Sequence, residues 1–356
     1  MDLFSLDNII ISKPELNPSQ YFNSDSSESS TSLIKSNHTI LILHLPHRLS
    51  QQMNTRRLLT TASKTLNVCL STSHSNSNPF TLLFRPLFTR RTMASAAAKR
   101  LTGKTILVTG ASSGIGRSTA LEFARTAPNN DIRLILTARR VDSLKELAEE
   151  IRKEVGDGVK VLPFKLDVSN PAEVKGIVGN LPEEWRNIDV LVNNAGLVKG
   201  VARAPEIAAD DINVMFQTNV TGLINMTQAI LPIFLARPDG GHGDIINVGS
   251  IAGREPYPGG GIYCATKAAV RSFTDSLRKE LIASRVRVIE IDPGQVETEF
   301  SVVRFYGDKE KADAVYAGCE PLTPDDIAEI IVFTATRREN VVVADTLVFP
   351  SHQVTY

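Results

Sequence analysis

The sequence predicts an α/β fold, in which a single doubly wound domain is built on a parallel sheet of about seven strands flanked by helices. Three observations support this. From Lys104 onward, short runs rich in Val, Ile and Leu alternate with segments of helical length, as in β-α-β units. The runs are almost continuously apolar, as in strands buried on both faces. The first run ends in a glycine-rich turn at Gly110, where a helix is expected to begin.

The strands are placed on these apolar runs in chain order. They are Thr105–Thr109, Arg133–Thr137, Val159–Phe164, Ile188–Val192, Asp244–Val248, Val286–Ile291 and Val341–Val348. The helices are placed where apolar residues recur at the spacing of one buried face. They run from the glycine-rich turn to about Thr126, over Val141–Val155, from Ile207 to about Phe234, and from Tyr263 to Leu281.

Residues 1–98 are expected to form a disordered or targeting-like extension that precedes a cofactor-binding domain at residues 99–356. The extension is rich in Ser, Thr and Asn, and it contains no glycine and no sustained periodicity. Such a segment cannot bury enough apolar area to offset its chain entropy. From Met53 onward it is basic and lacks acids, as transit peptides do, but several acids precede that stretch.

Two explanations of the extension stay open: Met53 or Met93 is the real start, or the segment is a plain disordered extension. We expect a cytoplasmic protein. A mitochondrial location is the alternative if the stretch from Met53 acts as a presequence.

Charge and cysteine content exclude several classes of partner. The 356 residues carry 39 Lys+Arg and 39 Asp+Glu, and this zero net charge gives no bulk attraction to nucleic acid or to anionic membranes. The three cysteines, Cys69, Cys264 and Cys319, lie far apart without CxxC spacing. We therefore expect neither a disulfide framework nor a bound metal.

The glycine-rich turn after the first strand is expected to bind the pyrophosphate of a dinucleotide, as in a Rossmann-type domain. Gly110 permits the tight turn, Gly114 lets the backbone approach a phosphate, and Gly116 lets helix and strand pack closely. The helix that follows points free N–H groups and its positive dipole end at the phosphates. A plain strand-to-helix turn is the alternative. The expected contacts are Gly110, Ser112, Ser113, Gly114, Ile115 and Gly116.

The end of the second strand favours NADP over NAD. An acidic residue there would bond the ribose hydroxyls, whereas Arg139 offers a guanidinium fork suited to a 2′-phosphate, and Arg140 can stack or pair nearby. A solvated charge pair is the alternative. After the third strand, Asp167 and Val168 are expected at the adenine, where Asp167 accepts a hydrogen bond. Asp167 is otherwise an N-cap for the next helix, a role for which Ser169 competes.

Tyr263 and Lys267 are expected to be the proton-transfer pair. Residues four apart lie on one helix face, so Lys267 can place its ammonium beside the Tyr263 hydroxyl. A nearby positive charge stabilises a phenolate and lowers the tyrosine pKa towards the working pH. Tyr and Lys four residues apart are also common on surface helices, so the interpretation of this pair depends on the residues around it.

Two further polar residues strengthen this interpretation. Ser250 lies at the end of the fifth strand, 13 residues before Tyr263, and open α/β sheets bind ligands at that end of their strands. Its hydroxyl could bond a substrate carbonyl oxygen. Asn219 lies inside a predicted helix, where asparagine is unfavourable without a purpose. It is expected to hold a water that links Lys267 to solvent, and a structural kink is the alternative.

From about residue 101 to the end, the chain resembles the short-chain dehydrogenase/reductase superfamily, and residues 1–98 lie outside the resemblance. The motifs occur in the expected order. They are Thr109–Gly116 (TGASSGIG), Asn193–Gly196 (NNAG), Asn219, Ser250, the YxxxK pair Tyr263/Lys267, and Pro293-Gly294. One departure is Gly249, which stands where many members carry a second serine.

The resemblance implies a catalytic tetrad, further cofactor contacts and an oligomer. The implied tetrad is Asn219, Ser250, Tyr263 and Lys267, with Lys267 also binding the nicotinamide ribose. Asn194 would line the cofactor cleft together with Ala195 and Gly196. Val296 and Thr298, which follow Pro293 and Gly294, resemble residues that hold the nicotinamide carboxamide. A homodimer or homotetramer is implied, with a main interface at the helices after Gly196 and at Tyr263.

The segment after Gly294 is similar to a subfamily of NADP-dependent 3-hydroxy acid dehydrogenases, which oxidise serine, allo-threonine and related compounds. The similarity extends over Glu297–Phe305, Gly307-Asp308, Lys311-Ala312, Leu322–Ala328, Ser250–Arg254 and Tyr257-Pro258. A hydroxy acid carries a carboxylate, which Arg304 on a mobile lid could clamp bidentately. A salt bridge that pins the lid is the alternative for Arg304.

The expected activity is therefore hydride exchange between NADP(H) and the C3 hydroxyl or carbonyl of small 3-hydroxy acids. The candidates are serine, allo-threonine, 3-hydroxyisobutyrate and 3-hydroxypropionate, or the matching semialdehydes in reverse. An NADPH-dependent carbonyl or ketoacyl reductase that prefers a neutral substrate is the first alternative. A non-catalytic NADP-binding regulator is the second, against which the presence of both Tyr263 and Lys267 argues.

Overall fold

The computed structural model describes residues 10–11, 29–36, 39–46 and 95–353. The chain divides into two compact units, residues 1–89 and 90–356. In the first unit, β1 (Ile10–Ile11), β2 (Ser29–Ser36) and β3 (Thr39–Pro46) form an antiparallel sheet in the order β1-β3-β2. Most of the predicted extension lies outside the described residues. The predicted boundary at residue 98 stays a prediction, and the 3₁₀ helix η2 (Ala98–Leu101) spans it.

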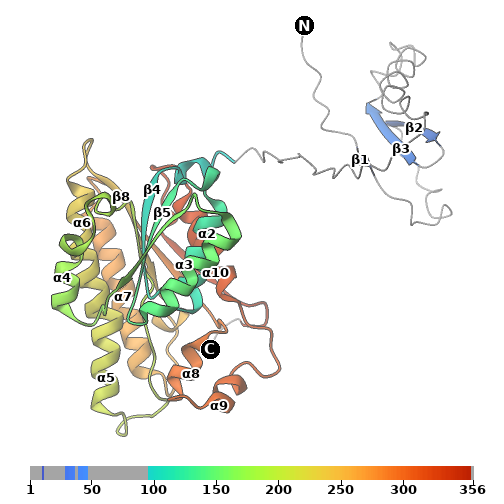
Figure 1. Cartoon of the computed structure of the whole chain (residues 1–356). Coiled ribbons are helices and arrows are strands. Elements are labelled where there is room, and N and C mark those ends of the chain that lie inside the picture. The colour runs from blue at the N-terminus through green and yellow to red at the C-terminus, as the bar shows by residue number, and fades with distance from the viewer. Residues whose placement is uncertain (1–9, 12–28, 37–38, 47–94, 354–356) are drawn as a thin grey trace, which may run out of the picture. The chain divides into compact units, whose positions relative to one another are not determined.

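The second unit is built on a parallel sheet of seven strands in the order β10-β9-β8-β7-β4-β5-β6 (Figure 1). The strands are β4 (Lys104–Thr109), β5 (Ile132–Ala138), β6 (Lys160–Lys165), β7 (Val190–Asn193), β8 (His242–Val248), β9 (Arg285–Pro293) and β10 (Asp345–Val348). Each predicted strand is confirmed, with shifted ends. The last strand is shorter than predicted. The Val341 carbonyl accepts from Arg287, and the bonds to β9 begin at Ala344, whose carbonyl accepts from both Arg278 and the Glu290 amide.

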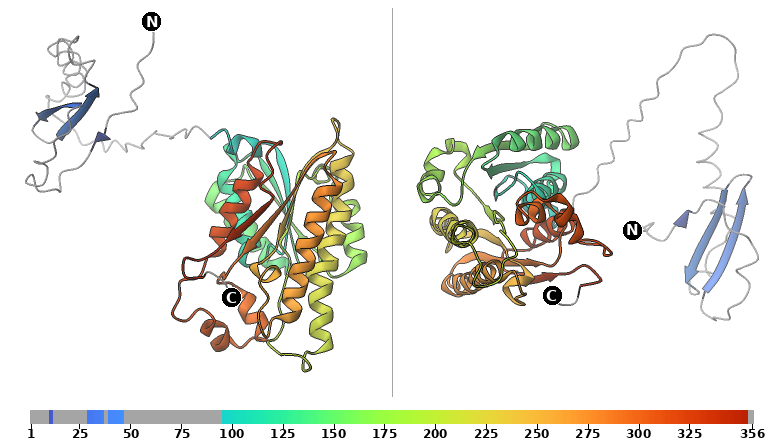
Figure 2. Two further views of the ribbon diagram at one scale, coloured as in Figure 1. Left: turned by 180° about the vertical axis from the view of Figure 1, so that it is seen from behind. Right: turned by 90° about the horizontal axis from the view of Figure 1, so that it is seen from below.

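Helices cover both faces of this sheet, as the views in Figure 2 show. The helices are α2 (Gly114–Thr126), α3 (Val141–Val155), α4 (Pro171–Asn180), α5 (Ala209–Phe216), α6 (Leu223–Leu235), α7 (Gly261–Glu280), α8 (Glu299–Arg304), α9 (Lys309–Ala314) and α10 (Pro324–Ala335). Short 3₁₀ turns η3 (Pro128–Asn130), η4 (Glu183–Trp185) and η6 (Ile251–Gly253) connect some of them. In the described part of the chain, no helix has the length and apolar character to cross a bilayer.

Alternate side chains of each central strand enter two separate hydrophobic cores. In β4, Ile106 and Val108 join the core formed with α2, α3 and α10, whereas Leu107 joins the core formed with α4, α6 and α7. These three residues are fully buried. A strand buried on both faces favours apolar residues on both, which explains the largely continuous apolar runs in the sequence.

The order of the strands indicates which edge of the sheet is suited to binding a ligand. The strand order reverses between β4 and β7, and open α/β sheets bind ligands at such a point, outside the carboxyl ends of the strands. Because the seven strands are parallel, their carboxyl ends meet along this edge. The loops after β4, β5, β7, β8 and β9 therefore converge there.

The long helix predicted from Ile207 to about Phe234 is interrupted. Between α5 and α6 the chain forms a π-helical segment, η5 (Gln217–Gly222), which contains Asn219. Such segments inside α-helices commonly occur at functional sites. Periodicity alone does not reveal it, because one extra residue per turn barely disturbs the apolar pattern of a helix of this length.

Candidate active site

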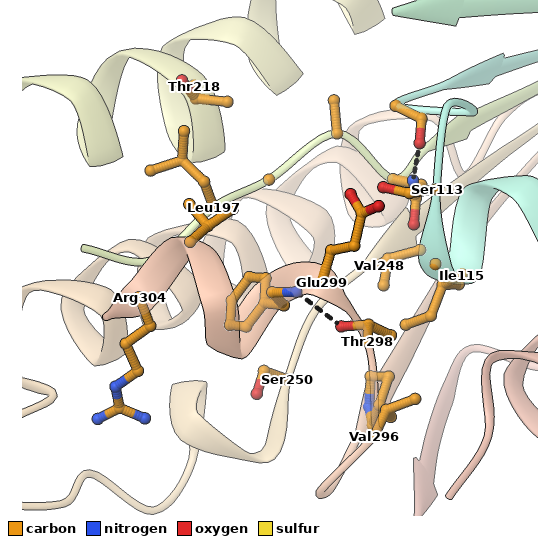
Figure 3. A pocket seen from close by; sticks show the side chains of 18 of the residues that line it. Ser113, Ile115, Leu197, Thr218, Val248, Ser250, Val296, Thr298, Glu299 and Arg304 are labelled. Carbon is orange, nitrogen blue, oxygen red and sulfur yellow. Dashed lines mark hydrogen bonds between the residues drawn. The ribbon is translucent and has the colours of Figure 1, made fainter. Parts of the chain in front are cut away.

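A cavity of about 460 Å³ opens at the carboxyl edge of the sheet, and most of the predicted site residues line it. Figure 3 shows its wall, with Ser113 and Ile115 from the glycine-rich turn, Ser250 from the end of β8, and Glu299 and Arg304 from α8. Two predicted residues, Gly116 and Asn219, are absent from the lining. Both lie directly behind residues that do line it.

The glycine-rich turn is held by the segment after β7. Gly110 adopts a φ of +67°, and a Cβ there would lie 2.8 Å from Ala195 Cα. A Cβ at Gly116 would overlap the Asn194 side chain and the Gly110 carbonyl oxygen. Asn194 Nδ2 donates to the carbonyls of Thr109 and Gly110, at 2.9 and 3.2 Å. Asn194 therefore fixes the turn, and Gly116 provides the room for it.

The start of α2 suits an anionic ligand. Ser113, the N-cap, makes no side-chain capping bond, and no acidic residue lies in the first turn. The first helical residues, Gly114 and Ile115, line the cavity. Unsatisfied N–H groups and the positive end of the helix dipole favour phosphate at such a position.

Two arginines add positive charge beside this helix start. Arg139 and Arg140 follow β5 and line the cavity. Arg140 donates to Ser113 Oγ at 3.0 Å and to Glu299 Oε2 at 2.8 Å, and this bond lowers the pKa of Glu299. The ion pair is half-exposed, so it adds little stability. It nevertheless connects the loop after β5 to α8 across the cavity mouth.

The structure corrects one alternative for Asp167. Asp167 Oδ1 accepts hydrogen bonds from the Ser169 amide and hydroxyl, at 3.0 and 2.7 Å. The N-cap of α4 is neither Asp167 nor Ser169 but Asn170, whose side chain accepts from the amides of Ala172 and Glu173. Asn170 is the N-cap because it directly precedes Pro171, the first helical residue. A proline at that position has no N–H that needs a partner. Asp167 still lines the cavity.

Tyr263, Lys267 and Ser250 meet at the far side of the cavity. The Lys267 ammonium lies 5.8 Å from the centroid of the Tyr263 ring and donates to the Val248 carbonyl at 2.8 Å. Burial lowers the pKa of Lys267 to about 8, against the opposing effect of Asp292 and Glu290. Lys267 is therefore a buried cation close to its titration point.

Ser250 is fixed through its backbone and its hydroxyl. Its amide donates to Asp292 Oδ1 at 2.9 Å, and its Oγ accepts the Ala252 amide at 3.1 Å. An accepting hydroxyl still has its own proton to donate.

The aromatic ring of Phe300 packs edge-on against Tyr263, with centroids 5.4 Å apart. The serine hydroxyl and the phenol thus line one cavity from two different elements.

Asn219 connects two segments behind the site. Its Oδ1 accepts the Leu197 amide at 2.9 Å, and its Nδ2 donates to the Leu197 carbonyl at 2.8 Å and to Thr266 Oγ1 at 3.1 Å. A Cβ at Gly196 would lie 3.4 Å from Asn219 Oδ1 and 3.8 Å from Lys267 Nζ. The missing side chain of Gly196 therefore leaves a small space between the asparagine oxygen and the lysine ammonium.

Arg304 lines the cavity without an acidic partner. Its guanidinium lies 5.3 Å from the centroid of the Tyr257 ring, and its Nε is buried without a hydrogen-bond partner. Within residues 95–353 it forms no ion pair, so the alternative of a pinning salt bridge does not hold there. In Figure 3, Glu299 points towards Ser113, whereas Arg304 lies on the side away from it.

Several lining residues escaped the sequence-based prediction. Tyr257, Phe300 and Tyr316 give the cavity aromatic walls, and Glu299 gives it a negative group. Isolated aromatic residues have no spacing that marks them, so only their contacts identify them. Tyr257 lies against Arg304, Phe300 packs against Tyr263, and the Tyr316 hydroxyl bonds Ser301. A similarity to known sequences was the one signal available, at Tyr257 and within residues 297–305.

Gly249, the departure noted in the sequence, is explained by the neighbouring strand. A Cβ at Gly249 would overlap Asp292 Oδ1 and would lie 2.8 Å from Glu290 Oε1. Both carboxyl groups come from β9 and are almost completely buried. The space that a serine side chain would need is thus occupied by two acids.

Comparisons with known proteins agree with this geometry. Residues 104–306 match the model of the short chain dehydrogenase family. The chain is 58% identical over 254 residues to an NADP-dependent 3-hydroxy acid dehydrogenase of Schizosaccharomyces pombe, which covers 71% of this chain and 95% of that one. It is 42% identical over 248 residues to sulfoacetaldehyde reductase 2 of Chromohalobacter salexigens, covering 70% and 94%.

A solved structure gives the same result. The closed form of a serine dehydrogenase complexed with NADP⁺ superposes with a TM-score of 0.64 at 41% identity, and the match covers 70% of this chain and 96% of that chain. The matched share corresponds in size to the second unit.

The crowding at Gly249 leads to a stability prediction. Gly249→Ser should lower the free energy of unfolding by about 1–3 kcal/mol, the usual cost of overpacking, as measured by urea denaturation. Gly179→Ser is the control, since a Cβ there meets nothing within 4 Å. In an Asp292→Ala background the Gly249→Ser change should cost less. Equal costs at Gly249 and Gly179, or no difference between backgrounds, would contradict the steric explanation.

Proposed function

The chain belongs to the short chain dehydrogenase family, and from this premise we propose that it is an NADP-dependent oxidoreductase acting on small 3-hydroxy acids. Serine, allo-threonine, 3-hydroxyisobutyrate and 3-hydroxypropionate are the substrates proposed. The observation that carries the proposal is Arg304, a cation with no acidic partner among residues 95–353, in the same cavity as Tyr263 and Ser250.

NADP fits the residues at the other end of the cavity. The open start of α2 would receive the pyrophosphate, and Arg139 and Arg140 would bind the 2′-phosphate. Arg140 is already held towards Ser113 by Glu299. When bound, the nicotinamide supplies or accepts the hydride, and Val296 and Thr298 are the residues proposed to hold its carboxamide.

Three side chains of the protein would manage the proton and the developing charge. In the oxidation direction, Tyr263 as a phenolate would take the proton of the substrate C3 hydroxyl. In the reduction direction, the Tyr263 phenol would donate a proton to the substrate C3 oxygen. The Lys267 ammonium stabilises that phenolate by its charge. The Ser250 hydroxyl would donate to the substrate oxygen and so hold it next to Tyr263.

The space at Gly196 supports the role proposed for Asn219. A water there would lie between Asn219 Oδ1 and Lys267 Nζ, and both groups can bond a water molecule. Such a water would carry protons between the lysine and solvent. Asn219 would then be a positioning residue that acts through this water rather than a lining residue.

The relatives point to an anionic substrate. A 3-hydroxy acid and sulfoacetaldehyde, the compounds for which two of the relatives are named, both carry an anionic group that one carbon atom separates from the reacting carbon. An arginine can bind carboxylate and sulfonate oxygens with two N–H groups.

The apolar side chains Leu197, Val296 and Val303 in the lining favour the second candidate, a reductase of neutral carbonyl compounds. Homo-oligomerisation and a cytoplasmic location stay predictions.

The direct test follows NADPH absorbance with the four 3-hydroxy acids and either NADP⁺ or NAD⁺. We expect turnover with NADP⁺, weaker turnover with NAD⁺, and a loss of at least about 100-fold in kcat for Tyr263→Phe, the scale of a positioned proton-transfer group. Parent rates in the Tyr263→Phe protein would contradict the proton role. Turnover of neutral ketones alone would favour the second candidate.

Arg304→Ala separates an acid substrate from a neutral one. Loss of a charge-assisted bond should raise KM for a carboxylate substrate by about 10- to 100-fold, while KM for a neutral alcohol changes little. Arg304→Lys keeps the charge but loses the bidentate geometry, so it should fall between the two. Equal effects on both substrates would end the idea of a carboxylate clamp.

Gly196→Ala tests the proposed water. The added methyl group makes only ordinary contacts, so the melting temperature should stay within a few degrees of the parent value. It would displace the water, and we expect kcat to fall by about tenfold, part of the usual contribution of a positioned proton pathway. Gly179→Ala is the control. An unchanged kcat in the Gly196→Ala protein would rule out a water at this position.

A further inference from the structure

Two buried acids lie directly beneath the Ser250 loop. Glu290 and Asp292 are two residues apart near the end of β9, so they project from the same face of the sheet, and they are 2% and 1% exposed. Their carboxyl groups crowd the same space beneath Gly249. Gly249 makes room for both. A carboxyl pair at this depth needs a physical explanation, because buried charge is costly.

The two acids have very different partners. Asp292 accepts the Ser250 amide at 2.9 Å and Arg254 Nε at 2.8 Å. Glu290 Oε1 is buried without a hydrogen-bond partner. Two carboxylates crowded together at this depth repel each other, so one of them is expected to carry a proton. The charge therefore belongs on Asp292 and the proton on Glu290.

The electrostatics of Glu290 agree with this assignment. Burial, followed by the charge of Asp292, raises the pKa of Glu290 to about 8. Burial also raises the pKa of Asp292, but Arg254 and the Ser250 amide oppose that effect.

Charged groups surround the pair from every element packed against it. Arg254, just after η6, pairs with Asp292 and also with Asp345, which β10 places opposite Glu290. From α7 come Lys267, whose pKa both acids raise, and Arg278, which donates to the carbonyl of Val288. The same helix carries Arg271, whose Nε is buried without a partner.

We propose that Asp292 and Glu290 are positioning residues of the active site: Asp292 anchors Ser250 and supplies the one buried negative charge that keeps Lys267 protonated, and Glu290 stays neutral so that this charge remains single. The functions of Ser250 and Lys267 in this statement rest on the proposed function. The protonation of the pair does not.

The pair has a defined effect on stability. Because the pKa of Glu290 is raised from 4.5 to about 8, the folded protein binds this proton more tightly than the unfolded chain. The contribution is complete below about pH 4.5 and is lost as pH rises towards 8. Lys267 has the opposite sign, since its pKa is lowered from 10.5 to about 8, and its contribution to stability rises only between those values.

The first experiment tests the shared proton without turnover. Infrared spectra of the full-length protein in D₂O at neutral pH should show the carbonyl band of a protonated carboxylic acid, which disappears in Glu290→Gln and persists in Glu280→Gln, an exposed control on α7. The urea concentration at half-unfolding should fall between about pH 5 and pH 8 in the parent, the range that the raised pKa of Glu290 sets. It should fall less in Glu290→Gln. A band that survives in Glu290→Gln, or identical midpoint profiles, overturns the assignment.

The second experiment tests the charge that acts on Lys267. NADPH binding, followed by its fluorescence over a pH series, should weaken with a midpoint near the pKa of Lys267. Glu290→Gln keeps the Asp292 charge, so it should move the midpoint less than loss of that charge does. The double variant Glu290→Gln/Asp292→Asn removes the charge and should lower the midpoint by about one pH unit, as loss of a nearby opposite charge does. An unmoved midpoint in the double variant overturns the role of the pair.

The third comparison tests the anchoring of Ser250. In Asp292→Asn the amide oxygen can still accept the Ser250 N–H, whereas in Asp292→Ala it cannot. At a pH where both bind NADPH, kcat should be lower in Asp292→Ala at unchanged KM, and equal kcat values overturn the anchoring. If the parent binds no NADPH and oxidises no 3-hydroxy acid, the proposed function fails, while the infrared result still decides where the proton is.

Discussion

The direction of the strands is the constraint on which the site depends. Because the seven strands are parallel, each ends at the same edge, and the polar residues that follow β4, β5, β7, β8 and β9 are brought together without any sequence proximity. Ser250 and Asp292 are 42 residues apart, yet adjacent strands hold their atoms at hydrogen-bonding distance.

The cavity is electrostatically divided along its length. One end has an open helix start with Arg139 and Arg140, which suits the phosphates of a cofactor. The other end has Arg304 beside aromatic rings, which suits a small anion. Lys267 lies between them as a buried cation. Three separate positive groups in one cavity favour ligands that are anionic at both ends, and α8 contributes to both ends through Glu299 and Arg304.

The sequence allowed the sheet to be predicted and Tyr263 and Lys267 to be placed on one helix, because both depend on short-range spacing. Strands buried on two faces have continuous apolar runs, and Tyr263 and Lys267 are four residues apart on one helix. Properties that depend on a second segment were not predictable. The interruption at Asn219 depended on its bonds to Leu197 and Thr266. The cause of Gly249 lay on another strand, at Glu290 and Asp292.

The charges beneath the site are linked because each one compensates the next. From the interior to the surface, Lys267, Asp292, Arg254 and Asp345 alternate in sign, and exposure rises to 41% at the Asp345 side chain. A buried ion is tolerated only when its charge is compensated and its hydrogen-bonding groups are satisfied. An additional negative charge at Glu290 would break this alternation, since its free oxygen has no donor to meet it. A proton on Glu290 leaves Asp292 as the charge that compensates Lys267, and under this proposal the ionisation of Lys267 depends on residues that do not line the cavity.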